Sequence, residues 1–430
     1  MAYGNAREHE LRYQVDSGAF ATVVDATWVN GIPFLAVAPD MGSMIRSVAP
    51  NDNYRTRIFG THPMVPSLAT GELTFGVYLH GRSTAVADDA RATITSPDFP
   101  IAAFLSNAWG GIRLGFRTTV ASGTTASPVV EAADGAEYEA GDWVFAHDTS
   151  SDATRGFFRK IASISTDTLT MWAGHTLPTA DAADVLGAVI SAYPHRSRMV
   201  NPEHASHVLH SFFHAGELAE DCQQAEGVKL NLTAIEGLAA GEPGMLQFQG
   251  MAARVVKEGL TAPAAEDPIG DAPLPTSTDN DTIFSVSAVG AALATIQVQS
   301  CTVTPGFASQ PIPCLGGVNG RSGYTLVADS GDAPMIEMVT HFDSSWSIGF
   351  LAGTRYQVLI QVGTEAGEAY GIFAANCELV EDPTRGDATD LATSVLKFRP
   401  LESAISTAAT GDALEKVRAK LEILFSCALA

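Results

Sequence analysis

Residues 225–256 read AEGVKLNLTAIEGLAAGEPGMLQFQGMAARVV, and this stretch predicts two strands joined by a turn. Apolar and polar residues alternate from Val228 to Leu232, and Ile235 continues the apolar side almost in phase. This period of two is typical of a sheet with one packed and one wet face. Gly and Pro residues in 237–244 predict the turn, and 245–251 resume the apolar pattern. Because an isolated hairpin is unstable in water, other strands must complete the sheet.

A similar pattern recurs later in the chain. Residues 282–304 alternate again after a turn of small residues, and 356–362 (YQVLIQV) form a cleaner strand that is followed by a Gly-containing turn. The two halves share a pattern rather than identical residues. We interpret this as an internal duplication.

Composition indicates a folded chain of several domains. Its 430 residues are 46% hydrophobic and 17% charged, a balance that excludes a disordered protein. No apolar run is long enough for a membrane helix, and the polar start of the chain has no apolar core of a signal peptide. We therefore expect synthesis in the cytoplasm.

The net charge is −23, which argues against binding of nucleic acid through counterion release. The five Cys residues show no CxxC spacing, so we expect reduced and mostly buried thiols.

The domain prediction follows the breaks in apolar periodicity. Segments such as 141–147 and 157–165, with Asp, Thr and Gly turns between them, predict a small β-barrel module inserted at 118–193. The module interrupts a first β domain formed by 1–117 and 194–261. A Pro/Ala/Asp-rich linker at 262–281 precedes a second strand-rich domain, and a helix ends the chain. We place the second domain at 282–402 and the helix at 403–430.

The helix prediction depends on an apolar stripe within 411–429, which contains Leu414, Val417, Leu421 and Leu424. Asp412 is a suitable N-terminal residue for such a helix. We expect the helix to pack on a sheet of its own domain, or alternatively on a neighbouring subunit.

Candidate functional residues are few. His207, His210 and His214 would share a helical face and could bind a divalent metal, but a polar element at a subunit contact is the simpler interpretation. Arg46, Arg55 and Arg57 surround an irregular loop at 49–66 that could contact an acidic patch of a neighbouring subunit, or be solvated. No catalytic or cofactor-binding motif is present, so we expect neither an enzyme nor a bound cofactor.

Four stretches resemble the tail tube protein family of siphophages. They are GTHPMVPSLATGELTFGVYLHG (60–81), VKLNLTAIEGLAAGEPGMLQFQGMAA (228–253), WSIGFLAGTRYQVLIQVGTEAGEAYGIFAANCELVEDPTRGD (346–387) and TSVLKFRP (393–400). The segments GDWVFAH, RKIASIS and DTLTMWAG of the predicted module are similar to modules found inside some tube proteins. The resemblance covers most of residues 10–400, as a pattern of strands and turns.

The resemblance implies a mainly β fold: tube domains of β-sandwich or barrel type with a flanking helix, the small inserted β-barrel and a second tube-like domain. It also implies a virion tail protein, assembled in the host bacterial cytoplasm, that polymerises into stacked rings. A second tube domain, for which an immunoglobulin-like domain is the alternative, would give a ring of three chains with pseudo-sixfold symmetry; a single one would give six chains. Expected partners are further copies of the chain, the tape measure, terminator and tail-tip proteins, and DNA that passes without specific binding.

An acidic bore would repel DNA and prevent its adhesion. The carboxylates that we expect to point into the bore are drawn from Glu72, Glu226, Glu236, Glu242, Glu337 and Glu365. The alternatives are a tail terminator, a baseplate hub or a capsid decoration protein, or else a β-rich carbohydrate-binding protein or enzyme. The five Trp residues are scattered, which argues against a carbohydrate platform.

Overall fold

A computed structural model describes most of the chain. The described residues are 9–15, 32–34, 37–40, 44–49, 65–93, 99–148, 152–195, 207–213, 223–239, 242–256, 282–318, 321–328, 334–341, 343–383, 385–388, 391–403 and 410–430. Strands dominate this part of the chain, so the predicted mainly β class is confirmed. None of its helices is long and apolar enough to cross a membrane. The linker at 262–281 lies outside the described residues.

Six antiparallel strands form a continuous sheet, which we call the central sheet. In order across the sheet they are β5 (Val65–Tyr78), β17 (Met245–Ala252), β16 (Gln223–Ala239), β21 (Val298–Thr304), β24 (Met335–His341) and β28 (Leu391–Pro400). The ladder between β16 and β21 joins strands from the two sides of the predicted linker. The two predicted β domains are therefore continuous through one sheet.

The predicted hairpin at 225–256 is the middle of this sheet. Val228, Leu230 and Leu232 of β16 are fully buried, as their alternation predicts. Between Leu232 and Ala234 the register with β17 shifts by a β-bulge, which inserts one residue and brings Ile235 back onto the buried face. The bulge explains why Ile235 lies three residues after Leu232 rather than two.

The central sheet contains two sets of strands with the same arrangement. In the first set β5 lies between β3 (Val37–Asp40) and β17, and β17 pairs with β16. In the second set β24 lies between β21 and β28, and β28 pairs with β26 (Tyr370–Leu379). In the first set the second strand, β5, is itself one strand of a long hairpin, whereas in the second set a long hairpin precedes β24. A helix comes later in each set: α1 (Pro100–Trp109) comes two short strands after β5, and α3 (Ser345–Leu351) follows β24 directly.

The aromatic packing under the two helices also corresponds. Phe104 of α1 contacts the ring of Phe248 on β17, with 5.9 Å between centroids. Trp346 of α3 contacts the ring of Phe398 on β28, with 6.1 Å between centroids. Because β17 and β28 occupy the same place in their sets, these two pairs mark equivalent positions in the sets.

The inserted region has its own small core. Its strands are β9 (Phe116–Thr124), β10 (Ser127–Val130), β11 (Trp143–Asp148), β12 (Asp152–Ser165), β13 (Thr168–Met171) and β14 (Val185–Pro194). Val120, Val144, Ile161 and Leu186 are among the buried residues of this core. The last strand, β14, pairs with β11 through residues 186–188 and with β8 (Gly110–Arg113) and β29 through residues 189–194. It therefore joins the inserted region to the main body.

The prediction of a long C-terminal helix is wrong. Helix α4 (Asp412–Arg418) ends where Ala419 turns to an extended conformation, and β29 (Glu422–Leu429) follows. The first six residues of β29 are all buried, and the strand pairs with β14, with β26 and, in parallel, with β6 (Arg82–Val86). A continuous apolar run suits a strand that is buried on both faces, and here it coincides with helical spacing.

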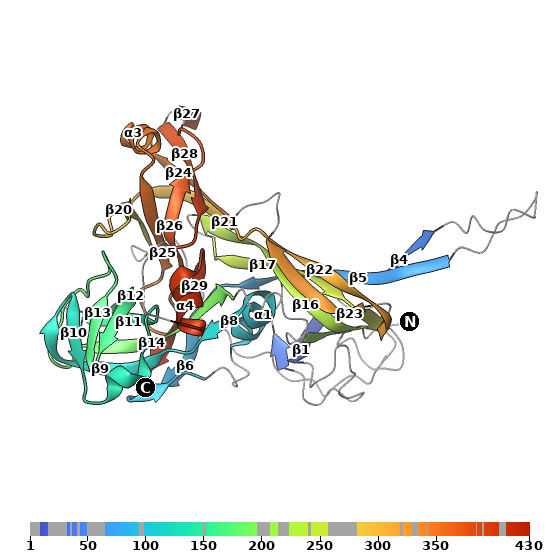
Figure 1. Ribbon diagram of the computed structural model, residues 1–430, viewed down its shortest axis with the longest axis horizontal. Helices are drawn as coiled ribbons and strands as arrows, with labels where there is room; N and C mark the ends of the chain where they lie inside the picture. Colours follow the sequence, from blue (N-terminus) through green and yellow to red (C-terminus); the bar gives the residue numbers. More distant parts are fainter. Residues whose placement is uncertain are drawn as a thin grey trace, which may run out of the picture.

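Figure 1 shows how these parts lie in space. The inserted region occupies one end of the molecule, next to α4 and β29. β24, β28 and α3 rise at the top of the view. Two long hairpins extend on the opposite side from the inserted region: β5 with β4 (Met44–Ala49), and β22 (Phe307–Val318) with β23 (Arg321–Ala328). We call them the β4–β5 arm and the β22–β23 arm.

Candidate functional surface

One face of the central sheet carries the buried core, and we call the opposite one the open face. Glu72 on β5, Glu236 on β16 and Glu337 on β24 are exposed and alternate with buried neighbours. The cross-strand register places all three on the open face, because directly opposed residues share a face. We call them the open-face glutamates.

The register can be followed from strand to strand. On β5, Gly76 faces the same side of the sheet as Glu72. A Cβ atom added to Gly76 would lie 2.7 Å from the sulfur of Met245, so Met245 lies on this side as well. Met245 is opposite Glu236, and Gln247 beside it donates a hydrogen bond of 3.4 Å to Glu236. Across the junction of the two sets, the core residues Ile235, Val303 and Ile336 are paired in series, which leaves Glu337 on the open face.

Basic residues on the second set are paired with carboxylates. The Lys397 ammonium lies 2.9 Å from the Glu381 carboxylate, and this contact raises the pKa of Lys397. Glu378 contacts both Arg399 and Arg355, and the hydrogen bond from Arg399 is the main cause of a lowered pKa of Glu378. The bases are therefore largely neutralised by local partners.

The other three predicted bore carboxylates lie elsewhere. Glu226 is only 1% exposed and lies 3.7 Å from Arg254, so the prediction that it lines an open surface is wrong. Glu242 is exposed in the turn between β16 and β17. Glu365 is exposed in the turn between β25 (Arg355–Val362) and β26, away from the central ladder.

The central sheet has one open strand edge near each end, although part of β28 also pairs with β26, which continues into β25 and β29. Within the described residues, β3 is bonded only to β5, and at the other end β27 (Arg385–Ala388) is bonded only to β28. Unpaired strand edges present a row of backbone donors and acceptors that can pair with another chain. These edges can therefore extend the sheet into a neighbouring copy.

The β4–β5 arm provides a further extended surface. Arg46 lies on β4 opposite Ala69 of β5, within the arm. The other two arginines predicted for intersubunit contacts, Arg55 and Arg57, lie outside the described residues.

Helix α3 exposes apolar side chains that its counterpart α1 does not. In α1, Phe104, Leu105 and Trp109 are fully buried, and the helix contacts β16, β8 and β14. In α3 no residue is buried, and Ile348 and Leu351 are 68% and 79% exposed. Adjacent large apolar side chains at such exposure are typical of a surface that becomes covered on association.

The histidine segment is not helical. His207 and His210 lie on β15 (His207–Phe213), where they pair with Val15 and Arg12 of β1 (His9–Val15). A spacing of three residues does not return to the same side of a strand, so the helical face on which the metal hypothesis depended is absent. His214 lies outside the described residues.

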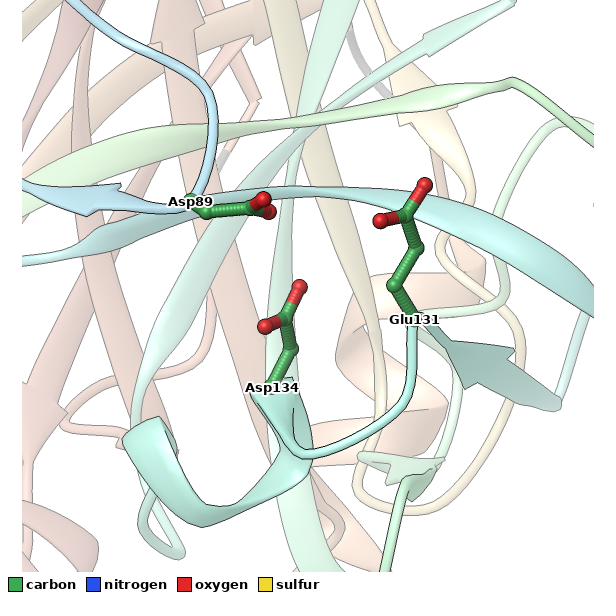
Figure 2. Close-up of side chains that lie close together, drawn as sticks. All are labelled: Asp89, Glu131 and Asp134. Carbon is green, nitrogen blue, oxygen red and sulfur yellow. The ribbon is translucent and has the colours of Figure 1, made fainter.

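One cluster was missed by sequence reasoning, because its members come from separate segments. Asp89, Glu131 and Asp134 bring their carboxylate oxygens together within 4.8 Å (Figure 2). Thr119 donates a hydrogen bond of 2.6 Å to Glu131, and Thr118 donates one to Asp134. Asp89 and Glu131 are exposed, and such acidic groups are common on protein surfaces without an ion.

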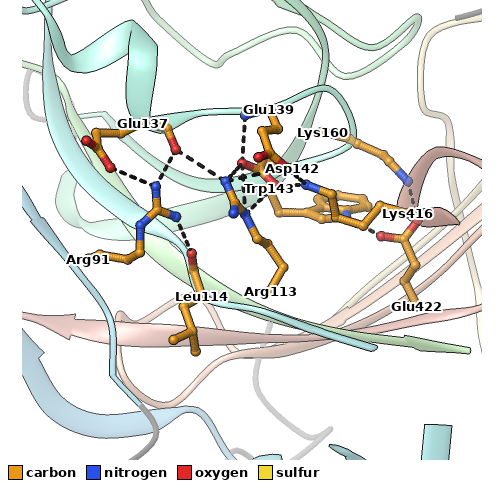
Figure 3. Close-up of polar contacts among 10 residues, drawn as sticks. All are labelled: Arg91, Arg113, Leu114, Glu137, Glu139, Asp142, Trp143, Lys160, Lys416 and Glu422. Atoms are coloured by element: carbon orange, nitrogen blue, oxygen red, sulfur yellow. Dashed lines mark hydrogen bonds and ion pairs between the residues drawn. The ribbon is translucent and has the colours of Figure 1, made fainter. Parts of the chain in front are cut away.

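A second group of polar residues joins the inserted region to the C-terminal segment (Figure 3). Lys416 of α4 lies 2.5 Å from Asp142 and 3.1 Å from Glu139. Arg113 also contacts Asp142, at 3.0 Å, and the Asp142 carboxylate contributes to a raised pKa of Arg113 against the lowering effect of burial. Beside this group, Lys160 of β12 contacts Glu422 of β29.

No protein-family model matches the chain. No curated protein matches its sequence either.

Proposed function

We propose that this chain is a structural protein that polymerises into stacked rings and forms the hollow tail tube of a long, non-contractile phage tail. The observation that carries the proposal is the pair of equivalent strand sets in one continuous sheet with open edges. Within the chain, the last strand of the first set pairs with the first strand of the second set. A comparable antiparallel junction between copies, from β27 beside β28 to β3 of the next chain, would close the sheet into a ring.

Two sets in each chain favour three chains in a ring, with pseudo-sixfold symmetry. The open face would then line the bore, and the open-face glutamates would repel the DNA phosphates that pass along it. Lys397 lies directly opposite Glu337 and would offset part of its charge, so Glu72 and Glu236 would carry most of this repulsion. The arms project from the body, in the position where one ring could contact the next, and Arg46 on the β4–β5 arm is a candidate for that contact.

The exposed side of α3 supports association with a second copy. In the first set, strands of the same chain cover α1. In the second set, the described part of the chain leaves Ile348 and Leu351 of α3 without such cover, and the neighbouring chain in a ring would supply it. Other virion proteins of the tail, such as the tape measure, terminator and tail-tip proteins, would contact the ends or the bore of the tube.

Negative-stain electron microscopy of the purified protein at rising concentration tests the proposal. We expect stacked rings or striated hollow tubes, with threefold symmetry in end-on class averages. Sixfold averages with six full chains in each ring would contradict the equivalence of the two sets. A compact particle that never stacks, even with a tail-tip nucleus, would refute the tube and favour a terminator or decoration protein.

A further inference from the structure

Lys160 and Glu422 form an ion pair that is closed off from solvent. The two residues are 262 positions apart in the sequence, and their side chains are 0% and 1% exposed. Lys160 belongs to β12 of the inserted region and Glu422 begins β29, so the contact spans the junction between the inserted region and the C-terminal strand (Figure 3). The amine donates a hydrogen bond directly to Oε1 of Glu422.

The surroundings of the pair are aromatic. The Lys160 nitrogen lies 5.4 Å from the ring centroid of Trp143, 5.0 Å from that of Trp172 and 5.1 Å from that of Phe373. The second carboxylate oxygen of Glu422 accepts a hydrogen bond of 2.7 Å from Nε1 of Trp143. These rings fix both groups in place and exclude water from them.

Burial favours the uncharged forms of both groups. It lowers the pKa of Lys160 against the opposing effect of Glu422, and it raises the pKa of Glu422 against the opposing effect of Lys160. A neutral amine held against a neutral carboxylic acid is a reactive pair, because a desolvated lysine is a nucleophile. In contrast, burying both groups in their charged forms carries a large desolvation free energy.

The adjacent pair of Lys416 and Asp142 shows what an ordinary ion pair looks like in this protein. The Asp142 carboxylate accepts a hydrogen bond from Lys416, three from Arg113 and one of 2.8 Å from the backbone N–H of Glu139. Two cations and a backbone donor therefore surround that carboxylate. Glu422 accepts hydrogen bonds from one amine and one indole instead, and burial raises its pKa.

We propose that Lys160 and Glu422 condense into an intramolecular isopeptide bond, which covalently joins the inserted region to the C-terminal strand. The lone pair of Nζ attacks Cδ of the protonated Glu422, and the new C–N bond gives a tetrahedral centre. Nε1 of Trp143 donates to Oε2, where negative charge develops during the attack. One proton passes from the nitrogen to Oε1, the C–Oε1 bond breaks, and water leaves. No oxidant, reductant or other co-reactant is needed.

Two physical factors favour this reaction. The two groups are held at hydrogen-bond contact, and such fixed reactants behave as if each were at an effective concentration far above any attainable in solution. The product is a neutral amide, so no charge has to be kept in the aromatic site, and the same rings protect the bond from hydrolysis. This inference is independent of the proposed function, because it depends only on the junction.

Intact-mass spectrometry of the purified full chain under denaturing, reducing conditions tests the proposal. We expect a mass below the sequence mass by one water molecule, and a branched peptide that joins the segment around Lys160 to the segment around Glu422 after proteolysis. Lys160→Met should restore the full sequence mass, whereas the matched variant Lys416→Met should keep the loss of water. The wild-type measurement does not require any variant to fold.

Two results would overturn the proposal. The first is a wild-type mass that equals the sequence mass after prolonged incubation at neutral and mildly alkaline pH, which would make the contact an ion pair only. The second is a loss of water that maps to other residues, or that persists in Lys160→Met.

Discussion

Replacing the two exposed apolar residues of α3 should weaken self-association without unfolding the chain. We consider the double substitution Ile348→Ser and Leu351→Ser. Neither side chain contributes to the core of the isolated chain, because no residue of α3 is buried. Any large effect of the change must therefore come from contacts made between copies.

The expected magnitude follows from the exposure of the two side chains. Complete burial of an Ile or Leu side chain contributes about 1.5–3 kcal/mol. With 68% of Ile348 and 79% of Leu351 available for burial, the pair should contribute about 3 kcal/mol to each intersubunit contact. Since each 1.4 kcal/mol is a factor of ten, the critical concentration for assembly should rise about 100-fold.

Sedimentation of the protein over a concentration series measures the critical concentration. Val289→Ser is the matched control, because Val289 is also an exposed large apolar residue, at 42%, but lies outside α3. The variant and the control should have the thermal unfolding midpoint of the wild type. A double variant that assembles at the wild-type critical concentration would refute the assignment of α3 to the subunit contact.

Three further predictions follow from the core, a buried lysine and the open face. Phe248→Ala removes a ring that stacks on Phe75 at 5.4 Å, and should lower the free energy of unfolding by about 3–5 kcal/mol in a denaturant titration. Burial lowers the pKa of Lys229 to about 7, while the unfolded chain keeps that proton to a pH of about 10.4. The unfolded state therefore binds more protons in this window, so stability should rise with pH by up to about 1.4 kcal/mol per unit, and Lys229→Met should remove that slope from stability curves. Changing all three open-face glutamates to Gln should leave tube assembly intact but slow DNA ejection from phage that carry the variant, and an unchanged ejection rate would exclude their role in the bore.

The central hairpin could be predicted from sequence because its signals are local. Alternation from Val228 to Leu232 marks a half-buried strand, and the glycines after Ile235 mark the turn. Such patterns report on burial of one face, which is a property of neighbouring residues.

The C-terminal strand and the histidine strand could not be predicted in this way. The run from Ile423 to Phe425 fits a helical stripe and a doubly buried strand equally well, and only pairing with β14 and β26 decides between them. His207 and His210 likewise fit a helical face until β1 and the neighbouring β16 place their segment in a sheet. In both cases the partners lie far away in sequence.

The functional surface shows the same division. The sequence alone indicated a mainly β chain, with an acidic balance and candidate bore carboxylates, because composition and period are written into consecutive residues. The selection of Glu72, Glu236 and Glu337, and the exclusion of Glu226, required the cross-strand register, since the face of a residue is set by its partners. The aromatic enclosure of Lys160 and Glu422 has no sequence signature, because tertiary packing brings together residues 262 positions apart.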